Sequence, residues 1–539
     1  MVTQNTPPST PIRACSRKGK ILGPTDFHTF GTPPAPRHGP MRILHVSHEL
    51  PPYELAGTAI YTWHIAKAQA ANHEVFVFSR LQDPHVEPYR VHDEVRDGCR
   101  IRFVNRADLE WSPLDHSYED PKMRGIFANF LDETKPEVVH FQHVVGLGAG
   151  VIEEARSRGI TVVMTLHDFW AMCPMGQRMC YSDWSICDPI NFAKCGPCVF
   201  GAGHPDAHAD APLYIEPTPP PKVEAPFEER RALHYQARVA ATPGRIARRP
   251  RAWAESWVEA ANDAIWGGGA STSVAETNPF VVRYRRMQQV LGLTDLLITP
   301  SAFLRDEFVK HFGVPRSKIV HSSNGMDFSY VERLAKTPSP KLRIGFVGSI
   351  IKTKGVHTLV DGFLAAAAGR NDLELHVHGA PNRWSGDYLD DLKRRAASNP
   401  NVVFHGRFDN RRIGTVLQNI DVLVLPSIWF ENAPLTLNEA AMSGTPILVS
   451  DRGGMLEFVK ANNYGWTFTL GDPKDLASKI RMLADDRSLV PKLAGAPPKI
   501  KPVSANAEEL LVVYRRLLDK SWKTPVTTAV GPADTFVVR

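Results

Sequence analysis

Two series of short apolar strands, each alternating with helical stretches, constrain the fold of this 539-residue chain more than any other feature. Alternation of strands with helices is typical of parallel, doubly wound sheets. Two series predict an α/β protein with two facing Rossmann-like domains and a central cleft, where the carboxyl ends of the strands bind ligands. The expected strands are 42–46, 74–78, 137–141, 161–166 and 295–299, then 342–347, 373–377, 402–404, 421–425, 446–449 and 466–468.

The domain limits follow from these series. We expect an N-terminal domain at 41–298 and a C-terminal domain at 299–500. A helix at about 505–521 follows a proline-rich linker and is expected to cross back onto the first domain. An insertion at about 173–280 is expected within the first domain, because this stretch is rich in cysteine and then in proline, with weak periodicity.

Both ends of the chain offer little to bury. Residues 1–40 are rich in Pro, Thr, Arg and Gly and are predicted to be a disordered tail, and residues 525–539 a loose one. No run of 18 or more apolar residues suggests a membrane span, and the start lacks the apolar core of a secretion signal. The sequence therefore predicts a cytoplasmic protein.

The charge balance excludes one class of partner. The 63 basic and 57 acidic residues leave a formal charge of +6, and no long basic run occurs, so nucleic-acid binding is not expected. The small positive excess is compatible with peripheral contact with anionic lipid at the inner face of a membrane.

A pair of carboxylates stands out in the second series. Glu431 lies in the loop after the expected strand 421–425, and Glu439 lies about one turn into a helix that starts near Leu435 and Thr436. The free N–H groups and the dipole of a helix N-terminus favour phosphate. Carboxylates accept hydrogen bonds from sugar hydroxyls. Together these features predict a sugar-nucleotide site.

The first series contributes weaker signals at the carboxyl ends of its strands. Gly57 opens a helix after the first strand, and its amide could approach a charged group, but an ordinary strand-to-helix loop has equal weight. His167 ends the strand at 161–166 and faces the expected cleft. A lone histidine is more often structural, and the same caution applies to His140 and His143.

The second series has similar strand-to-helix junctions. Gly348 and Ser349 follow the strand at 342–347, and Lys354 opens the next helix, where a lysine can pair with a diphosphate as a point charge. Gly453 and Gly454 lie at a later junction of the same kind. The ordinary alternative to a phosphate-binding lysine is a solvated lysine at a helix start. A phosphate site is therefore favoured only if several of these junctions meet in one cleft.

Taken together, these segments resemble the retaining glycosyltransferases of family 4, which have the GT-B fold. The resemblance covers about 41–180 and 283–485. It is carried by Pro51-Pro52 with Ala56-Gly57-Thr58, Asn72 to Val75, Leu166-His167-Asp168, Pro300-Ser301, Asn324 to Asp327, Gly348 with Lys354-Gly355, the Glu431 and Glu439 pair, the run Glu439 to Pro446, and Gly453-Gly454 with Glu457.

The resemblance implies roles for these residues. It implies that Glu431 contacts the donor sugar, Glu439 the nucleotide ribose, and His167 the sugar and acceptor. The amides of Leu435 and Thr436, with Lys354, would hold the diphosphate. The remaining donor-binding residues that it implies are Gly57, Gly348, Ser349, Gly453 and Gly454.

Two departures from the family pattern stand out. Ser349 replaces an arginine that often follows the equivalent glycine, so Lys352 or Arg452 would have to supply that charge. The first loop has Ala56-Gly57 in place of two glycines. No Asp-x-Asp triplet is present, and no cofactor is expected for catalysis.

The expected function is transfer of a sugar, with retention, from a UDP- or GDP-linked donor to a glycan or lipid-linked acceptor in surface polysaccharide synthesis. A catalytically silent GT-B protein that binds glycans or partners is one alternative. A GT-B phosphorylase or epimerase is another. A nicotinamide oxidoreductase is disfavoured because the chain has no G-x-G-x-x-G after its first strand.

Five cysteines follow His167 closely, and two of them have the spacing of a metal knuckle. Four of the five could form a structural zinc site; disulfides and free thiols are the alternatives, and no secretion signal supports disulfides. The candidate ligands are Cys173, Cys180, Cys187, Cys195 and Cys198.

Overall fold

The computed structural model describes residues 39–54, 56–107, 114–200, 278–382 and 385–522. Nearly all of the expected tails and most of the expected insertion lie outside the described residues. No helix in these ranges is long and apolar enough to cross a membrane.

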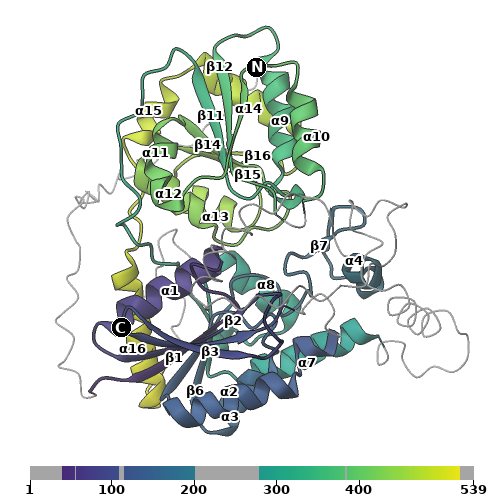
Figure 1. The fold of residues 1–539 in the computed structure, drawn as a ribbon. Coiled ribbons are helices and arrows are strands. Elements are labelled where there is room, and N and C mark those ends of the chain that lie inside the picture. Colours follow the sequence, from purple (N-terminus) through teal and green to yellow (C-terminus); the bar gives the residue numbers. More distant parts are fainter. Residues whose placement is uncertain (1–38, 55, 108–113, 201–277, 383–384, 523–539) are drawn as a thin grey trace, which may run out of the picture. The chain divides into compact units, whose positions relative to one another are not determined.

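The first sheet has eight strands in the order β10-β9-β6-β5-β1-β2-β4-β3. Figure 1 labels β1, β2, β3 and β6 among them. All neighbours pair in parallel except β3 and β4, which are antiparallel. The strands are β1 (Arg42–Ser47), β2 (Glu74–Leu81), β3 (Val91–Arg96), β4 (Cys99–Asn105), β5 (Val138–Phe141), β6 (Thr161–Thr165), β9 (Leu296–Thr299) and β10 (Ile319–His321).

Helices cover both faces of this sheet. On one face α2 (Pro121–Thr134), α3 (Gly150–Ser157), α7 (Pro279–Gly292) and α8 (Ala302–Phe312) share one core. On the other face α1 (Gly57–Ala70) and α16 (Val503–Leu518) share a second core. The helix expected near 505–521 therefore forms as α16 and packs on the first sheet.

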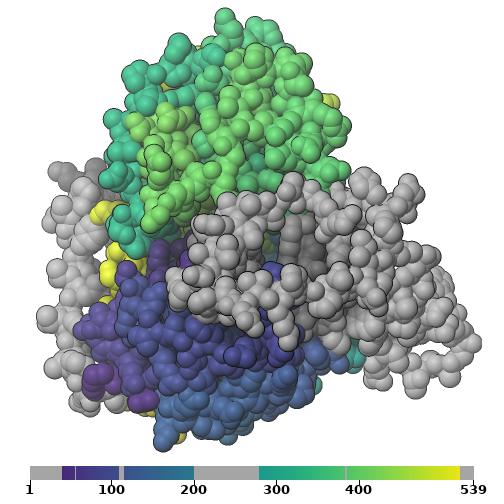
Figure 2. Space-filling view, in the orientation of Figure 1, coloured from purple at the N-terminus to yellow at the C-terminus, as the bar shows by residue number. Residues whose placement is uncertain are grey.

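The second sheet is parallel throughout, in the order β13-β12-β11-β14-β15-β16. Helices α9 (Val356–Ala367), α10 (Tyr388–Ala396) and α14 (Pro473–Asp485) cover one face, and α11 (Ile413–Gln418), α12 (Leu435–Ser443) and α13 (Gly453–Asn462) the other. The strands are β11 (Leu342–Val347), β12 (Leu373–His378), β13 (Val402–Gly406), β14 (Val422–Leu425), β15 (Ile447–Ser450) and β16 (Trp466–Phe468). Figure 2 shows the surface of the residues around each sheet, purple to blue for the first and mainly green for the second.

The predicted α/β fold with two Rossmann-like domains is confirmed, with differences in detail. Strands β3, β4 and β10 were not expected: β3 has a polar, edge-strand sequence, and β10 has only three residues. Because β10 pairs with β9, the first sheet continues to His321, past the expected boundary at 299.

The cysteine-rich stretch forms a small substructure of its own. A two-stranded hairpin, β7 (Met179–Cys180) and β8 (Ser185–Ile186), precedes a 3-10 turn (Phe192–Lys194) and the short helix α4 (Cys195–Phe200). Its Trp184 ring lies under the Lys352 ammonium, 4.4 Å from the ring centroid. The hairpin therefore contacts the loop that follows β11.

Candidate active site

Two helix N-termini meet at the centre of the predicted site. A Cβ on Gly57, the first residue of α1, would lie 3.6 Å from Cγ of Leu435, the first residue of α12. Neither helix has a side-chain cap, since Ala56 and Pro434 precede them. The first N–H groups of a helix have no intrahelical partner and carry the positive end of its dipole. Two such ends side by side have the geometry and the charge that suit an anion.

Glu431 lies beside this point, in the loop between β14 and α12, and its side chain is buried. Its Oε1 accepts three hydrogen bonds: from Lys354 Nζ at 2.5 Å, Ser427 Oγ at 2.8 Å and Trp429 Nε1 at 3.0 Å. Its Oε2 has no hydrogen-bond partner within the described part of the chain. One oxygen is thus held and the other remains available to a ligand.

Glycines fix the loop that carries Glu431. A Cβ on Gly454 would lie 1.4 Å from the Asn432 carbonyl oxygen, and one on Gly453 would lie 2.5 Å from that of Glu431. The Gly454 amide donates to the Glu431 carbonyl at 2.8 Å. The glycine pair therefore positions the Glu431 loop, and the Gly454 amide is already engaged.

Glu439 is also buried, on α12. The Tyr330 hydroxyl donates to its Oε1 at 3.1 Å. Burial raises the pKa of Glu439 to about 7, and hydrogen bonds from Tyr330 and Asn410 oppose this shift. The carboxyl group is poised to change charge near neutral pH.

Gly348 and Ser349 form the turn after β11. The Gly348 amide donates to the His378 carbonyl at 3.1 Å, and a Cβ on Gly379 would lie 1.8 Å from the Gly348 carbonyl oxygen. The ends of β11 and β12 therefore touch through their backbones, which keeps this turn in place.

The two suggested replacements for the missing arginine are both engaged elsewhere. Lys352 lies over Trp184, and the Arg452 guanidinium binds the Asp451 carboxylate at 3.2 Å. Lys354 is the lysine that contacts Glu431.

His167 follows β6 at the carboxyl edge of the first sheet. Its Nε2 donates to Gln142 Oε1 at 3.0 Å, and its carbonyl accepts from Asn432 Nδ2 at 2.9 Å. Burial, reinforced by His143, lowers the pKa of His167 to about 3, so the imidazole is neutral at physiological pH. Through Asn432, His167 is linked directly to the loop of Glu431.

Other polar groups gather at the same edge of the first sheet. The His48 and His143 rings lie 4.5 Å apart, and His143 Nε2 is 3.3 Å from the Asp168 carboxylate. Within the described residues, His48 Nδ1 and Gln142 Nε2 are buried without a hydrogen-bond partner. Both atoms are therefore free to hydrogen-bond a group that enters this edge.

His140, in contrast, is structural. Its Nδ1 bonds the Tyr514 hydroxyl at 2.5 Å and its Nε2 bonds Thr165 Oγ1 at 2.8 Å. These bonds join β5 to β6 and to α16.

The six cysteines within the described residues are free. A zinc–sulfur distance of about 2.3 Å would place four tetrahedral sulfurs roughly 3.8 Å apart. In the part of the chain that the structure describes, His376, His378 and His405 form the only set of three or more potential ligands that lie within 4.8 Å of one another. The cysteine sulfurs would therefore have to move together to hold zinc.

Sequence reasoning missed several contributors to the site. Ser427 and Trp429 lie only a few positions before Glu431, so their closeness in the sequence was an available signal. Tyr330 and Gln142 carried no such signal, because each is far in sequence from the residue that it contacts.

Two Rossmann-like domains, uncapped helix N-termini and an anchored carboxylate are the features expected of the GT-B class of glycosyltransferases. The model of "Glycosyltransferase Family 4" matches residues 55–193, and that of "Glycosyl transferases group 1" matches residues 333–496. The chain belongs to the family 4 glycosyltransferases of GT-B fold, as its motifs indicated.

Similar proteins agree with this assignment. A glycogen synthase of Mycobacterium tuberculosis is 28% identical over 462 residues, covering 85% of this chain and 89% of the relative. The structure of sucrose-phosphate synthase from Thermosynechococcus elongatus matches with a TM-score of 0.58 at 16% identity, over 90% of this chain and 100% of the other. Anabaena HepE in complex with UDP and glucose matches with a TM-score of 0.51 at 13% identity, over 89% and 99%. These two likenesses concern the fold.

Proposed function

We propose that the protein transfers a hexose from a UDP- or GDP-linked donor to a glycan or lipid-linked acceptor, with retention of anomeric configuration. One observation supports the proposal more than any other. The Glu431 carboxylate, with Oε1 hydrogen-bonded and Oε2 available, lies beside two uncapped helix N-termini. The helix ends suit a diphosphate, and Oε2 of Glu431 suits the hydroxyls of the sugar attached to it. The complex of HepE with UDP and glucose is consistent with such a ligand.

The leaving diphosphate gains negative charge as the glycosyl bond breaks. Lys354 Nζ and the first amides of α1 and α12 are the groups that would stabilise this charge. The Lys354 ammonium is paired with the Glu431 carboxylate. An arriving diphosphate would compete for the ammonium, so donor binding and the freeing of Glu431 are coupled.

Retention by double displacement would require a nucleophilic carboxylate beneath the anomeric carbon. Glu431 is poorly suited to this role, because three donors on Oε1 withdraw electron density from the carboxylate. We favour attack by the acceptor on the face that the diphosphate leaves, with a phosphate oxygen taking the hydroxyl proton. Glu431 then holds the donor sugar throughout.

The acceptor would approach from the first sheet. His167 is neutral, and His48 and Gln142 have unpaired buried nitrogens, so this edge offers several uncharged hydrogen-bonding groups beside the Asp168 carboxylate. Such groups match the hydroxyls of a glycan. The glycogen synthase relative acts on a polysaccharide, as its name states, which supports a role in polysaccharide synthesis, expected in the cytoplasm and at most in peripheral contact with the membrane.

A panel of nucleotide sugars tests the proposal. We expect one UDP- or GDP-sugar to raise the melting temperature of the full chain and to yield a glycosylated product by mass spectrometry when glycan acceptors are added. The anomeric coupling constant of that product would be that of the donor. An inverted product would overturn retention, and a sugar 1-phosphate formed only with inorganic phosphate would identify a phosphorylase. Donor binding without turnover would favour a catalytically silent protein.

We also propose that four of Cys173, Cys180, Cys187, Cys195 and Cys198 bind a structural zinc ion. Backbone amides already donate to sulfur, from Tyr181 to Cys198 and from Asn191 to Cys187, each at 3.4 Å. Such bonds stabilise a thiolate. Burial raises the pKa of Cys173, Cys195 and Cys198, so an ion is needed to deprotonate them at neutral pH.

Metal analysis of the purified protein tests the zinc proposal. We expect at least one equivalent of zinc, reduced by one in the double variant Cys195→Ser/Cys198→Ser. Cobalt substitution should give intense sulfur-to-metal charge-transfer bands that the double variant lacks. A wild-type content well below one equivalent would contradict the proposal.

A further inference from the structure

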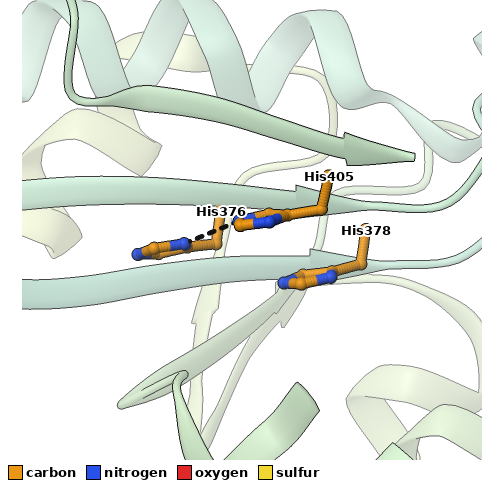
Figure 3. Close-up of side chains that lie close together, drawn as sticks. All are labelled: His376, His378 and His405. Carbon is orange, nitrogen blue, oxygen red and sulfur yellow. Dashed lines mark hydrogen bonds between the residues drawn. The ribbon is translucent and has the colours of Figure 1, made fainter. Parts of the chain in front are cut away.

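Three histidines at the edge of the second sheet form a cluster that the proposed function does not use. His376 and His378 project from the same face of β12, and His405 lies on the neighbouring strand β13, next to a shift in register (Figure 3). Their rings lie in nearly parallel planes, with interplanar angles of 1° between His378 and His405 and 16° between His376 and His405. One nitrogen of each ring lies within 4.8 Å of the others.

We propose that His376, His378 and His405 form a binding site for one divalent first-row transition-metal ion, such as Zn²⁺ or Co²⁺. Imidazole nitrogens without thiolates are ligands that suit this class of ions. Metal–nitrogen distances of about 2.0–2.1 Å place two tetrahedral nitrogens roughly 3.3 Å apart. His376 Nδ1 and His405 Nε2 are already 2.9 Å apart, so their separation has to grow by only about 0.4 Å, while the rings turn so that the lone pairs meet at one ion.

A carboxylate sets the tautomer of His376. Glu374 Oε2 lies 3.2 Å from His376 Nε2 and accepts a hydrogen bond from its N–H, so the Nδ1 lone pair faces His405. Glu374 is itself bound by the Lys341 ammonium at 3.2 Å. A carboxylate on the far nitrogen of a metal-binding histidine is a common way to orient the ligand and raise its basicity.

His378 supplies the third nitrogen. Only 9% of its surface is exposed, and its Nε2 is buried without a hydrogen-bond partner among the described residues. An unpaired nitrogen next to two imidazoles is what an empty metal site presents. His405 is exposed, which leaves a path for the ion and for a water ligand.

The position of the cluster gives metal binding a structural consequence. His378 immediately precedes Gly379, whose backbone touches that of Gly348 in the turn after β11. An ion shared by β12 and β13 would tie the edge strand to its neighbour at their carboxyl ends. We therefore expect metal to raise the melting temperature of the protein, because it binds the folded state selectively.

Titration of the full chain with Co²⁺ alone, followed by calorimetry and visible absorption, tests the site. We expect one equivalent whose spectrum lacks sulfur charge transfer, which separates it from a thiolate site. His405→Ala and His378→Gln should abolish this equivalent and the Co²⁺-dependent rise in melting temperature. Glu374→Gln should weaken binding roughly 10- to 100-fold, as expected for a residue that orients a ligand.

His85→Asn is the matched control, because His85 is exposed and lies on the first domain, outside the cluster. It should bind Co²⁺ as the wild type does. Equal stoichiometry and affinity in the wild type, His405→Ala and the control would overturn the proposal and assign the ion to other surface histidines. Because His405 is exposed, its variant should keep the circular dichroism spectrum of the folded protein. No nucleotide sugar is used, so the result is independent of the proposed transferase activity.

Discussion

The carboxyl edge of the first sheet is built mainly from imidazole and amide groups beside the single carboxylate of Asp168, whereas that of the second is built from a lysine, two glutamates and helix N-termini. His167 and Gln142 bond each other on the first edge. Lys354 and Glu431 pair on the second, with Glu439 on the helix that follows. Both edges arise in the same way, from loops that follow parallel strands.

The difference in chemistry matches the two substrates of a glycosyl transfer. A nucleotide sugar carries a charged diphosphate, so its edge needs cationic and dipolar groups whose charge is fixed before the reaction. An acceptor glycan presents neutral hydroxyls, which need hydrogen bonds but no countercharge. If this comparison is correct, substitutions on the two edges should differ in how far they lower kcat.

The largest effect is expected for Glu431→Gln. Glutamine has the size of glutamate but no charge, and one of the two accepting oxygens is replaced by an NH₂ group, which donates. We expect kcat to fall roughly 10²- to 10³-fold, as for the loss of one well-placed electrostatic contact in other active sites. Binding of the nucleoside diphosphate, measured by calorimetry, should change little.

Glu508→Gln, on the exposed side of α16, is the control for this measurement and should keep full activity. Near-wild-type turnover of Glu431→Gln would remove Glu431 from the site. Complete loss of donor binding would instead show that its role is to keep the loop folded.

A smaller effect is expected for His167→Ala on the first edge. His167 would offer one neutral hydrogen bond, so kcat should fall about tenfold, with donor affinity unchanged. Because the pKa of His167 is lowered to about 3, the wild-type pH–rate profile should show no titration of this histidine between pH 5 and 8.

His140→Ala provides the contrast on the same edge. It leaves the Tyr514 and Thr165 hydroxyls without their bonds, so the melting temperature should fall while kcat per folded molecule stays near that of the wild type. A reversal of these two outcomes would exchange the assigned roles of His140 and His167.

The sequence predicted the fold well because strands and helices of parallel sheets leave strong local patterns. The missed strand β3 has alternating exposure at a sheet edge, so it lacks the continuous apolar run of the central strands. The site was predicted in part. Glu431 and Glu439 follow from local spacing, whereas the contact of Gly57 with Leu435 joins the two domains and depends on tertiary folding.

The glycine pair illustrates the limit of local reasoning. Gly453 and Gly454 start a helix, and this position suggested a further phosphate contact. In the structure the carbonyl groups of Glu431 and Asn432 lie so close to the two glycines that a Cβ atom would collide with them. The sequence also did not reveal the cluster of three histidines on β12 and β13. Two histidines at alternate positions of one strand share a face, but the third belongs to another strand, and the pairing of the two strands is known only from the structure.

The smallest effect concerns the charge of Glu439, whose pKa is raised to about 7 by burial. In the unfolded chain this carboxyl group ionises near its ordinary pKa, so between that value and 7 the folded state binds more protons. The stability contributed by the protonated form is therefore present at low pH and is lost as pH rises toward 7. Glu439→Gln should accordingly stabilise the empty protein at pH 8 relative to the wild type.

Donor binding should depend on pH in the opposite direction. The ribose hydroxyls bind the carboxylate better than the acid, so affinity for the nucleotide sugar should fall about fourfold from pH 8 to pH 6.5, the factor for one group titrating near 7. The intact nucleotide sugar is the suitable probe, because its doubly esterified diphosphate does not titrate in this range. Calorimetry should show this slope in the wild type and none in Glu439→Gln, which retains a partner for the Tyr330 hydroxyl. An equal slope in both proteins would assign the titration to another group and leave Glu439 without a role in binding the ribose.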